Sequence, residues 1–291
     1  MEFGRLITAM VTPFDANGLI DWHTAGKLVD YLIEEQKSDS LVVAGTTGES
    51  PTLSDEEKLE LFRFVVKHTA GRSKVIAGTG SNNTAHTIHL TQAAEACGVD
   101  GILLVTPYYN KPSQEGLYQH FSAVAQATKL PIILYNVEGR TGVNLSVQTT
   151  LKLARIDNVV ATKDCASTDQ LTQIIREAPA GFQVYSGDDS ATLPALSVGA
   201  YGIISVASHI VGAKMQQLIS AYLSGQVAEA ARLNGELFPI FKGLFHCPHP
   251  VPNPVAVKHA LGLKGLPVGS VRLPLVDVNE SESKFLRDLV L

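Results

Sequence analysis

Short apolar segments recur along the chain, each bounded by glycine, proline or polar turn residues. They follow one another at intervals of roughly 20 to 35 residues, and several are apolar at every position instead of alternating. Strands that are buried on both faces, as in a parallel sheet, have this pattern. Eight strands are therefore predicted, beginning near Leu6, Leu41, Val75, Ile102, Ile132, Val159, Gln183 and Gly202.

Segments with helical periodicity separate these strands. Ser54 and Glu57 form a predicted capping box, and the helix after it is expected to have an apolar face made of Leu59, Leu61, Phe62, Val65 and Val66. Further helices are predicted to follow Asn83, Ser113, Ser146 and Ser167. Strand-then-helix units repeated eight times predict an α/β fold, a (β/α)8 TIM barrel.

The rest of the chain bears on domain organisation. The segment GTGSNN at residues 78–83 lacks the third glycine of a dinucleotide-binding fingerprint, which disfavours a nucleotide-binding sheet. The eighth strand is expected to end near Val206 and its helix near Leu223. Helical patterning then continues over residues 227–245, 255–263 and 280–291 without a flexible linker. Residues 1–225 are therefore predicted to form a catalytic barrel, and residues 226–291 a C-terminal helical module packed on it.

Composition narrows the class of ligand. Of 291 residues, 45% are hydrophobic and only 18% are charged, against an average of about 25%. Intrinsic disorder is excluded, and much of the chain is expected to be buried, in the barrel or between subunits. The net charge of −5 offers no general attraction to nucleic acid or anionic lipid. Chemistry on a small soluble molecule is favoured.

Three cysteines, Cys97, Cys165 and Cys247, form no disulfide framework, which is typical of a reducing compartment. The N-terminal residues lack the pattern of a signal peptide, and no stretch reaches the roughly 18 apolar residues of a membrane span. The protein is expected to be cytoplasmic, without membrane or nucleic-acid partners.

The active site of such a barrel lies at the C-terminal ends of its strands, and Lys163 is the most informative residue there. It follows the apolar residues 159–162, so its side chain leaves a strand inside the barrel mouth. Desolvation disfavours the ammonium and leaves a neutral amine that can attack a carbonyl. An ion pair with an acid such as Asp188 is the alternative. Most other lysines fall on predicted polar helix faces or loops.

Other polar side chains follow neighbouring strands. Tyr109 and Tyr135 can transfer protons as phenols, or can be rim aromatics. Thr46 and Thr47 lie between two glycines and can bind a small carboxylate through backbone N–H groups and hydroxyls, or form an ordinary turn. Arg140 can bind a second carboxylate, or form a surface ion pair. Together with the lysine, these residues favour metal-independent Schiff-base chemistry on a small keto acid.

The order of these motifs resembles the dihydrodipicolinate synthase family, within the N-acetylneuraminate lyase superfamily of class I aldolases. The resemblance covers nearly the whole chain. Its motifs are GTTGES at 45–50, TPYYNKP at 106–112, YNV at 135–137, RTG at 140–142, Lys163, SGDD at 186–189, Asn253-Pro254, Val257-Lys258 and RLPL at 272–275.

The resemblance implies condensation of pyruvate with L-aspartate 4-semialdehyde to 4-hydroxy-tetrahydrodipicolinate, the first committed step of diaminopimelate and lysine biosynthesis. It implies that Lys163 forms the Schiff base with pyruvate. The keto acid would be bound by Thr46, Thr47 and backbone groups of Gly187 and Ile204. The covalent imine would be the only intermediate on the protein, with no cofactor and no metal.

The resemblance also implies a proton relay and an assembly. Tyr135 would be the proton donor and acceptor, connected to solvent by Thr46 and by a Tyr109 that reaches in from a neighbouring subunit. Arg140 would receive the carboxylate of the semialdehyde and position Tyr135. A homotetramer, arranged as a dimer of dimers, is implied.

Two departures from the family pattern stand out. Glu138 replaces a usual proline and can either pair with Arg140 or point to water. The segment around His246, Cys247 and His249 is longer than usual; its spacing is poor for a metal, and an interface or surface loop is favoured.

A third departure concerns feedback by lysine. Lysine-sensitive relatives use a cleft between subunits at positions that match Ser50, Asn82, His86 and Tyr108. A critical glutamate is replaced here by His86, while Asp55 and Lys58 replace histidines. Loss of that carboxylate and the added Lys58 should repel a cation, so weak or absent inhibition by lysine is expected.

Two other functions stay open from sequence. Another pyruvate aldolase of the superfamily, such as a sialic acid or keto-deoxy-sugar lyase, is disfavoured by Arg140 but kept open by Glu138. A non-catalytic keto-acid-binding barrel is disfavoured by the intact set of Lys163, Tyr135, Tyr109 and Thr46.

Overall fold

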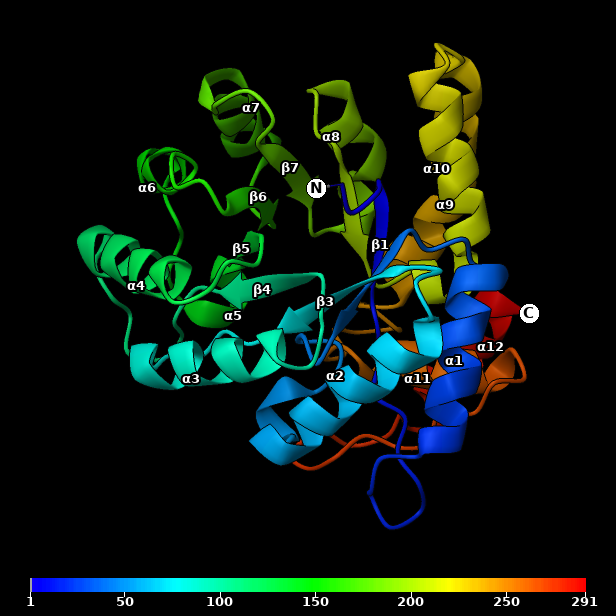
Figure 1. Cartoon of the computed structure of the whole chain (residues 1–291). Helices are drawn as coiled ribbons and strands as arrows, with labels where there is room; N and C mark the ends of the chain where they lie inside the picture. Colours follow the sequence, from blue (N-terminus) through cyan, green and yellow to red (C-terminus); the bar gives the residue numbers. More distant parts are fainter. Residues whose placement is uncertain (1) are drawn as a thin grey trace.

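The computed structural model describes residues 2–291, and eight parallel strands in chain order close into a barrel at its centre (Figure 1). The closure is the pairing of the last strand with the first, where Ile204 lies opposite Ile7. All eight predicted strands are confirmed: β1 (Leu6–Ala9), β2 (Ser40–Val43), β3 (Lys74–Gly78), β4 (Gly101–Val105), β5 (Ile132–Asn136), β6 (Val159–Asp164), β7 (Gln183–Ser186) and β8 (Gly202–Ser205).

Helices connect the strands and surround the barrel: α1 (Trp22–Glu34), α2 (Asp55–Thr69), α3 (Thr84–Glu95), α4 (Gln114–Gln126), α5 (Glu138–Thr141), α6 (Val147–Leu153), α7 (Thr168–Glu177), α8 (Thr192–Ser197) and α9 (Ser208–Leu223). The predicted starts are confirmed, because the side chains of Ser54, Asn83, Ser113, Ser146 and Ser167 each cap a helix, and Ser54 forms the capping box. Of the predicted apolar face of α2, Leu61, Phe62 and Val65 are buried, and Leu59 and Val66 are partly buried and pack against the same core. The buried face also includes Lys58 and Thr69.

The side chains of each strand alternate between two largely apolar surroundings, so most strand positions are apolar. One set of side chains fills the barrel interior, including Ile76, Ile133 and Ile204. The opposite set, including Leu104 and Leu134, packs against the surrounding helices. Strands that are buried on both faces of the sheet therefore have largely hydrophobic sequences.

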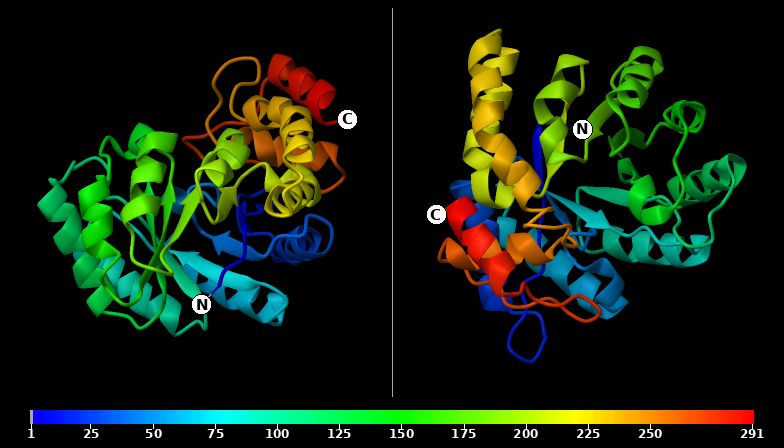
Figure 2. Two further views of the ribbon diagram at one scale, coloured as in Figure 1. Left: turned by 90° about the horizontal axis from the view of Figure 1, so that it is seen from above. Right: turned by 180° about the vertical axis from the view of Figure 1, so that it is seen from behind.

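Three C-terminal helices lie on one side of the barrel: α10 (Val227–Gly243), α11 (Val255–Leu263) and α12 (Glu280–Val290) (Figure 2). The first two pack against α9, and α12 packs against α10 and α11. Leu233, Phe241 and Leu261 share one hydrophobic cluster with Leu218 of α9. The predicted helices are confirmed, while the division between residues 225 and 226 stays a prediction. Within residues 2–291, no helix combines the length and apolarity needed to cross a bilayer.

The segment between α10 and α11 contains both buried and exposed side chains. Cys247 is buried, whereas His246 and His249 are exposed. His249 Nε2 lies 2.8 Å from Glu282 Oε1 of α12. Within the described part of the chain, no group of three or more histidine, cysteine, aspartate or glutamate residues is placed to hold a metal ion.

Two buried histidines predict how stability depends on pH. Burial lowers the pKa of His120 in α4 and of His209 in α9 to about 4, below the ordinary value of 6.5. Stability from such groups is fully present above pH 6.5 and is lost as the pH falls towards 4, because only the unfolded chain takes up the protons. Burial of Asp189, which raises its pKa from 3.8 to about 6, acts in the opposite sense below about pH 6.

His120→Phe is therefore expected to reduce the fall in stability between pH 6.5 and pH 4. One proton fewer in the unfolded state changes the slope by at most about 1.4 kcal/mol per pH unit. Urea unfolding at several pH values measures this slope, and the exposed His89→Gln variant is the control. A slope in His120→Phe equal to that of the wild type would contradict the assignment.

Candidate active site

Lys163 on β6 lies inside the barrel mouth. It pairs in register with Tyr135 of β5 and Tyr185 of β7, and both tyrosines belong to the interior cluster. Residues directly opposite each other on neighbouring strands point to the same face, so Lys163 points inward. Its residue is 5% exposed, and Nζ lies 4.3 Å from the centre of the Tyr135 ring. The predicted nucleophile is thus buried beside the predicted proton donor.

The alternative ion pair between Lys163 and Asp188 is not observed among the described residues. Asp188 Oδ1 instead accepts hydrogen bonds from the backbone N–H and the hydroxyl of Ser190, both at 2.9 Å. Asp164 faces the other side of β6, where Asn136 and Gln170 donate to its carboxylate. Burial raises the pKa of Asp164. No carboxylate therefore competes for the amine of Lys163.

Gly187 borders the stem of Lys163. A Cβ at this position would lie 2.7 Å from Lys163 Cε and 2.4 Å from Cys165 Sγ, so only glycine fits. The backbone N–H of Gly187 donates to Asp164 O at 3.0 Å. Of the two backbone groups that Gly187 was expected to offer to a ligand, the N–H is therefore already engaged and only the carbonyl is available. Ile204 is fully buried in the same interior cluster as Tyr135.

The loop of residues 45–50, which we call the threonine loop, follows β2. Thr46 lines a cavity together with Tyr135. Thr47 is 2% exposed, and its hydroxyl accepts a hydrogen bond from Asn253 Nδ2 at 2.9 Å, which leaves the hydroxyl proton for a ligand. Within residues 2–291, no hydrogen bond engages the backbone N–H groups of Thr46 and Thr47. The loop can therefore offer several donors to a carboxylate.

The cavity has a volume of about 550 Å³ and extends from the barrel mouth to the cleft between α2 and α3. At the mouth it is lined by Thr46, Tyr135, Val137 and Arg140. Lys163 does not line it directly, but contacts the lining through the Tyr135 ring. The far end is lined by Ser50, Asp55, Lys58, Asn82, His86 and Tyr108. Thr46, Tyr135 and Arg140 of the predicted active site thus line the same cavity as all four predicted lysine-site positions.

Arg140 lies on the short helix α5 at the rim of this cavity. Both Arg140 and Glu138 are exposed, and the described residues contain no ion pair between them. Of the two alternatives for Glu138, pairing with Arg140 is not observed, and neither is a surface ion pair of Arg140. Its guanidinium is available to a carboxylate ligand.

Tyr109 is the predicted site residue that a single chain does not bring to the site. Its side chain is 90% exposed, and it does not line the cavity, although its neighbour Tyr108 does. The backbone of Tyr109 has a φ of 72°, and that of Lys111 has a φ of 46°. Such conformations are uncommon for residues other than glycine, and here they present the phenol outward.

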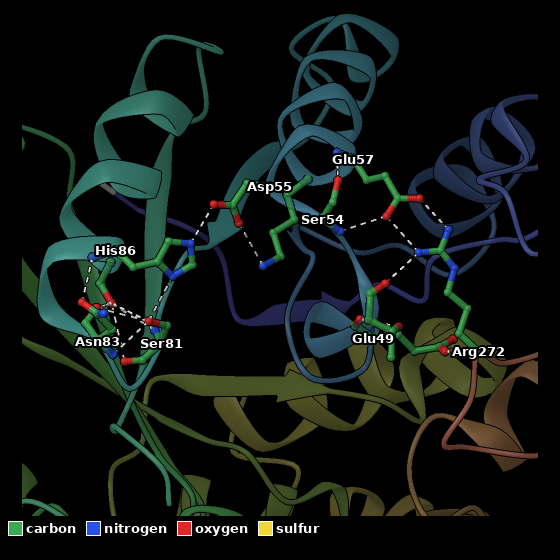
Figure 3. A network of polar contacts seen from close by, with 11 residues as sticks. Glu49, Ser54, Asp55, Glu57, Ser81, Asn83, His86 and Arg272 are labelled. Atoms are coloured by element: carbon green, nitrogen blue, oxygen red, sulfur yellow. Dashed lines mark hydrogen bonds and ion pairs between the residues drawn. The ribbon is translucent and has the colours of Figure 1, made fainter. Parts of the chain in front are cut away.

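The cleft between α2 and α3 contains a charged cluster (Figure 3). His86 Nε2 lies 2.7 Å from Asp55 Oδ2, and Lys58 Nζ lies 3.6 Å from Asp55 Oδ1. Burial by itself would raise the pKa of Asp55, but the hydrogen bond from His86 and the charge of Lys58 outweigh it and lower the pKa. The one carboxylate of this cluster is therefore already compensated.

The residues that fix the threonine loop on the side away from the cavity were not predicted from sequence. Lys258 of α11 forms a buried ion pair with Glu49, so it is an exception to the expectation that most lysines are solvated. The signal was a lysine in an otherwise apolar helical segment, VAVKHALGL. Its partner lies 209 positions away, and local patterns do not reveal such a pair.

The chain matches a known protein family over almost its whole length. The model of the Dihydrodipicolinate synthetase family matches residues 2–290. A 4-hydroxy-tetrahydrodipicolinate synthase from Bacillus velezensis is 56% identical over 291 residues, which cover 100% of this chain and 99% of the relative.

Two solved structures are similar over nearly the whole chain. A dihydrodipicolinate synthase from Bacillus anthracis is 51% identical, with a TM-score of 0.97 over 100% of this chain and 98% of that chain. A dihydrodipicolinate synthase from Cyanidioschyzon merolae with lysine bound is 45% identical, with a TM-score of 0.95 over 99% of this chain and 97% of that chain.

Proposed function

Because this chain belongs to the dihydrodipicolinate synthetase family, we propose that it uses Lys163 as the nucleophile for its reaction. The reaction is the condensation of pyruvate with L-aspartate 4-semialdehyde to 4-hydroxy-tetrahydrodipicolinate, in diaminopimelate and lysine biosynthesis. The observation that carries the assignment is the burial of an amine without an ion-pair partner, 4.3 Å from the ring of Tyr135. A structural lysine in such a place would leave a buried charge uncompensated.

The steps follow from the chemistry of a primary amine. Lys163 attacks the ketone carbon of pyruvate, water leaves, and an imine forms. Loss of a methyl proton gives an enamine, whose carbon attacks the aldehyde of the second substrate. The new oxyanion takes a proton, and the amino group of the semialdehyde then attacks the imine carbon. This attack displaces Lys163 and closes a six-membered ring, which leaves.

The surrounding residues bind the substrates and transfer protons. We assign the carboxylate of pyruvate to the unbonded N–H groups of Thr46 and Thr47, with Gly187 and Ile204 packed around the keto acid. Tyr135 delivers and removes the protons. Arg140, free of ion pairs at the cavity rim, binds the carboxylate of the semialdehyde. The scheme needs no cofactor and no metal, and the free cysteines suit a reducing compartment such as the cytoplasm.

Turnover with different substrates tests this function. Purified protein is expected to consume pyruvate only when L-aspartate 4-semialdehyde is added, and not to release pyruvate from N-acetylneuraminate. Release of pyruvate from a sugar acid without condensation would identify another aldolase of the superfamily. If neither reaction occurs, a non-catalytic barrel that binds a keto acid is the remaining alternative.

We also propose a homotetramer, arranged as a dimer of dimers, in which Tyr109 serves the site of a neighbouring subunit. The support is the exposure of Tyr109 and its positive φ, since both are unfavourable for an aromatic residue without a partner. In that arrangement Tyr109 and Thr46 relay protons between Tyr135 and solvent.

Mixing two inactive variants tests the exchange of Tyr109. Tyr109→Ala retains Lys163 but lacks the phenol, and Lys163→Ala retains the phenol. If subunits of the two variants are exchanged by dilution and reassembly, activity is expected to rise well above that of either parent. A mixture that contains hybrid oligomers but shows no gain would contradict a shared site.

We propose, further, that lysine inhibits this enzyme weakly or not at all. Ser50, Asn82 and Tyr108 line the cleft, but the carboxylate of Asp55 is already compensated by Lys58 and His86. An incoming ammonium would have to break these contacts or approach Lys58, and either is unfavourable.

His86→Glu is therefore expected to increase sensitivity to lysine. It replaces a partner of Asp55 by a second carboxylate, and the lysine concentration for half-inhibition is expected to fall by about tenfold or more. Steady-state assays with lysine measure this, with His89→Gln on the same helix as the control. Strong inhibition of the wild type at low lysine concentration would overturn the proposal.

A further inference from the structure

A buried ion pair joins the threonine loop to the C-terminal helices. Lys258 Nζ lies 2.9 Å from Glu49 Oε1, and the two side chains are 2% and 1% exposed. The same ammonium donates to Ser270 O at 2.6 Å and lies 4.3 Å from the centre of the Phe14 ring. Burial lowers the pKa of Lys258 in spite of Glu49. The charges are thus removed from water and depend on each other.

Further contacts from the C-terminal segment reach the same loop. Glu49 Oε2 accepts a hydrogen bond from the backbone N–H of Arg272 at 2.8 Å. The Arg272 guanidinium pairs with Glu57 at the start of α2 and donates to Thr52 O at 2.8 Å, directly after the loop (Figure 3). Asn253 Nδ2 donates to the Thr47 hydroxyl at 2.9 Å. The loop is therefore held from the C-terminal side at two of its six positions.

These contacts hold the threonine loop in a backbone conformation that is unfavourable at Glu49. Glu49 has a φ of 57°, in the left-handed region that favours glycine. Neither Glu49 nor Lys258 lines the cavity, so neither can contact a substrate there. Thr46, three positions before Glu49, does line it. The ion pair is thus behind the loop, and the carboxylate-binding groups are in front.

We propose that the Glu49–Lys258 ion pair is a positioning device for pyruvate. It fixes the threonine loop so that the N–H groups of Thr46 and Thr47 remain available to the pyruvate carboxylate. Removing one partner leaves an uncompensated buried charge, which the loop can only relieve by moving towards water. The inference rests on the proposed function, because it assumes that the threonine loop binds pyruvate.

Borohydride trapping at increasing pyruvate concentration tests this role. In Lys258→Met, the pyruvate concentration that gives half-maximal adduct is expected to rise by about tenfold, with the same final adduct at saturation. The KM for L-aspartate 4-semialdehyde is expected to change by less than about twofold. A general loss of structure would instead lower kcat and affect both substrates.

Matched variants separate positioning from folding. The double variant Glu49→Gln, Lys258→Met has no unpaired charge and is expected to need less pyruvate than Lys258→Met but more than the wild type. If thermal unfolding shows that Lys258→Met is not folded, the double variant is used as the test in its place. Lys214→Met, which removes the exposed pair with Glu236, is the control.

The possible failures are distinguishable. If the wild type forms no adduct, the proposed function is wrong. If the wild type forms the adduct and both folded variants reach half-maximal trapping at the pyruvate concentration of the wild type, the proposed function stands and the positioning role is wrong.

Discussion

Replacement of Lys163 by alanine is expected to lower kcat/KM by about 10⁴-fold or more, the largest effect of any single substitution in this chain. The proposed covalent route begins with this amine, and no other lysine lines the barrel interior within the described residues. Steady-state assays with both substrates measure the loss.

A matched variant shows that the loss is chemical. Lys163→Met retains most of the side-chain volume and removes an amine that is buried without an ion-pair partner. Its thermal midpoint is therefore not expected to fall, although its activity should be lost equally. Lys163→Met with activity within about tenfold of the wild type would contradict the covalent mechanism.

Replacement of Tyr135 by phenylalanine is expected to lower kcat by about 10²- to 10⁴-fold, the range of general acid–base catalysis. The substitution removes only the hydroxyl. The ring, which packs 4.3 Å from the Lys163 amine, is retained, so the environment of the nucleophile should change little.

The Tyr135 prediction is checked by comparing turnover with adduct formation. In Tyr135→Phe, borohydride should still trap pyruvate after long incubation, while turnover is lost. Tyr201→Phe, on a partly exposed tyrosine outside the cavity, is the control. Turnover of Tyr135→Phe within about threefold of the wild type would exclude the phenol as the proton carrier.

Much of the fold was predictable from local pattern. Each strand of a barrel is buried on both faces, so its sequence is a short apolar run, and the runs beginning near Ile132 and Val159 mark β5 and β6 directly. Because strand ends converge on one mouth, the same reasoning placed Lys163 beside Tyr135. Helix starts followed from capping side chains such as Ser54.

The remaining features depend on contacts that local pattern does not contain. The pairs Glu49–Lys258 and Asp55–His86 join separate elements. Whether Lys58 faces solvent or the cleft depends on the packing of α2 against α3. Strand-end position alone does not show which subunit Tyr109 serves; only the family resemblance implied a neighbouring subunit, and in the single chain Tyr109 is exposed. Sequence patterns therefore predicted the positions of the candidate residues at the strand ends, but not the long-range contacts that hold them.

The role of Lys163 can be tested by the mass of the intact protein and of its peptides after incubation with pyruvate and borohydride. One reduced pyruvyl group per chain is expected, located on the peptide that contains Lys163, and none on Lys163→Met. An unmodified wild-type chain, or an adduct on any other lysine, would contradict the assignment of Lys163 as the nucleophile.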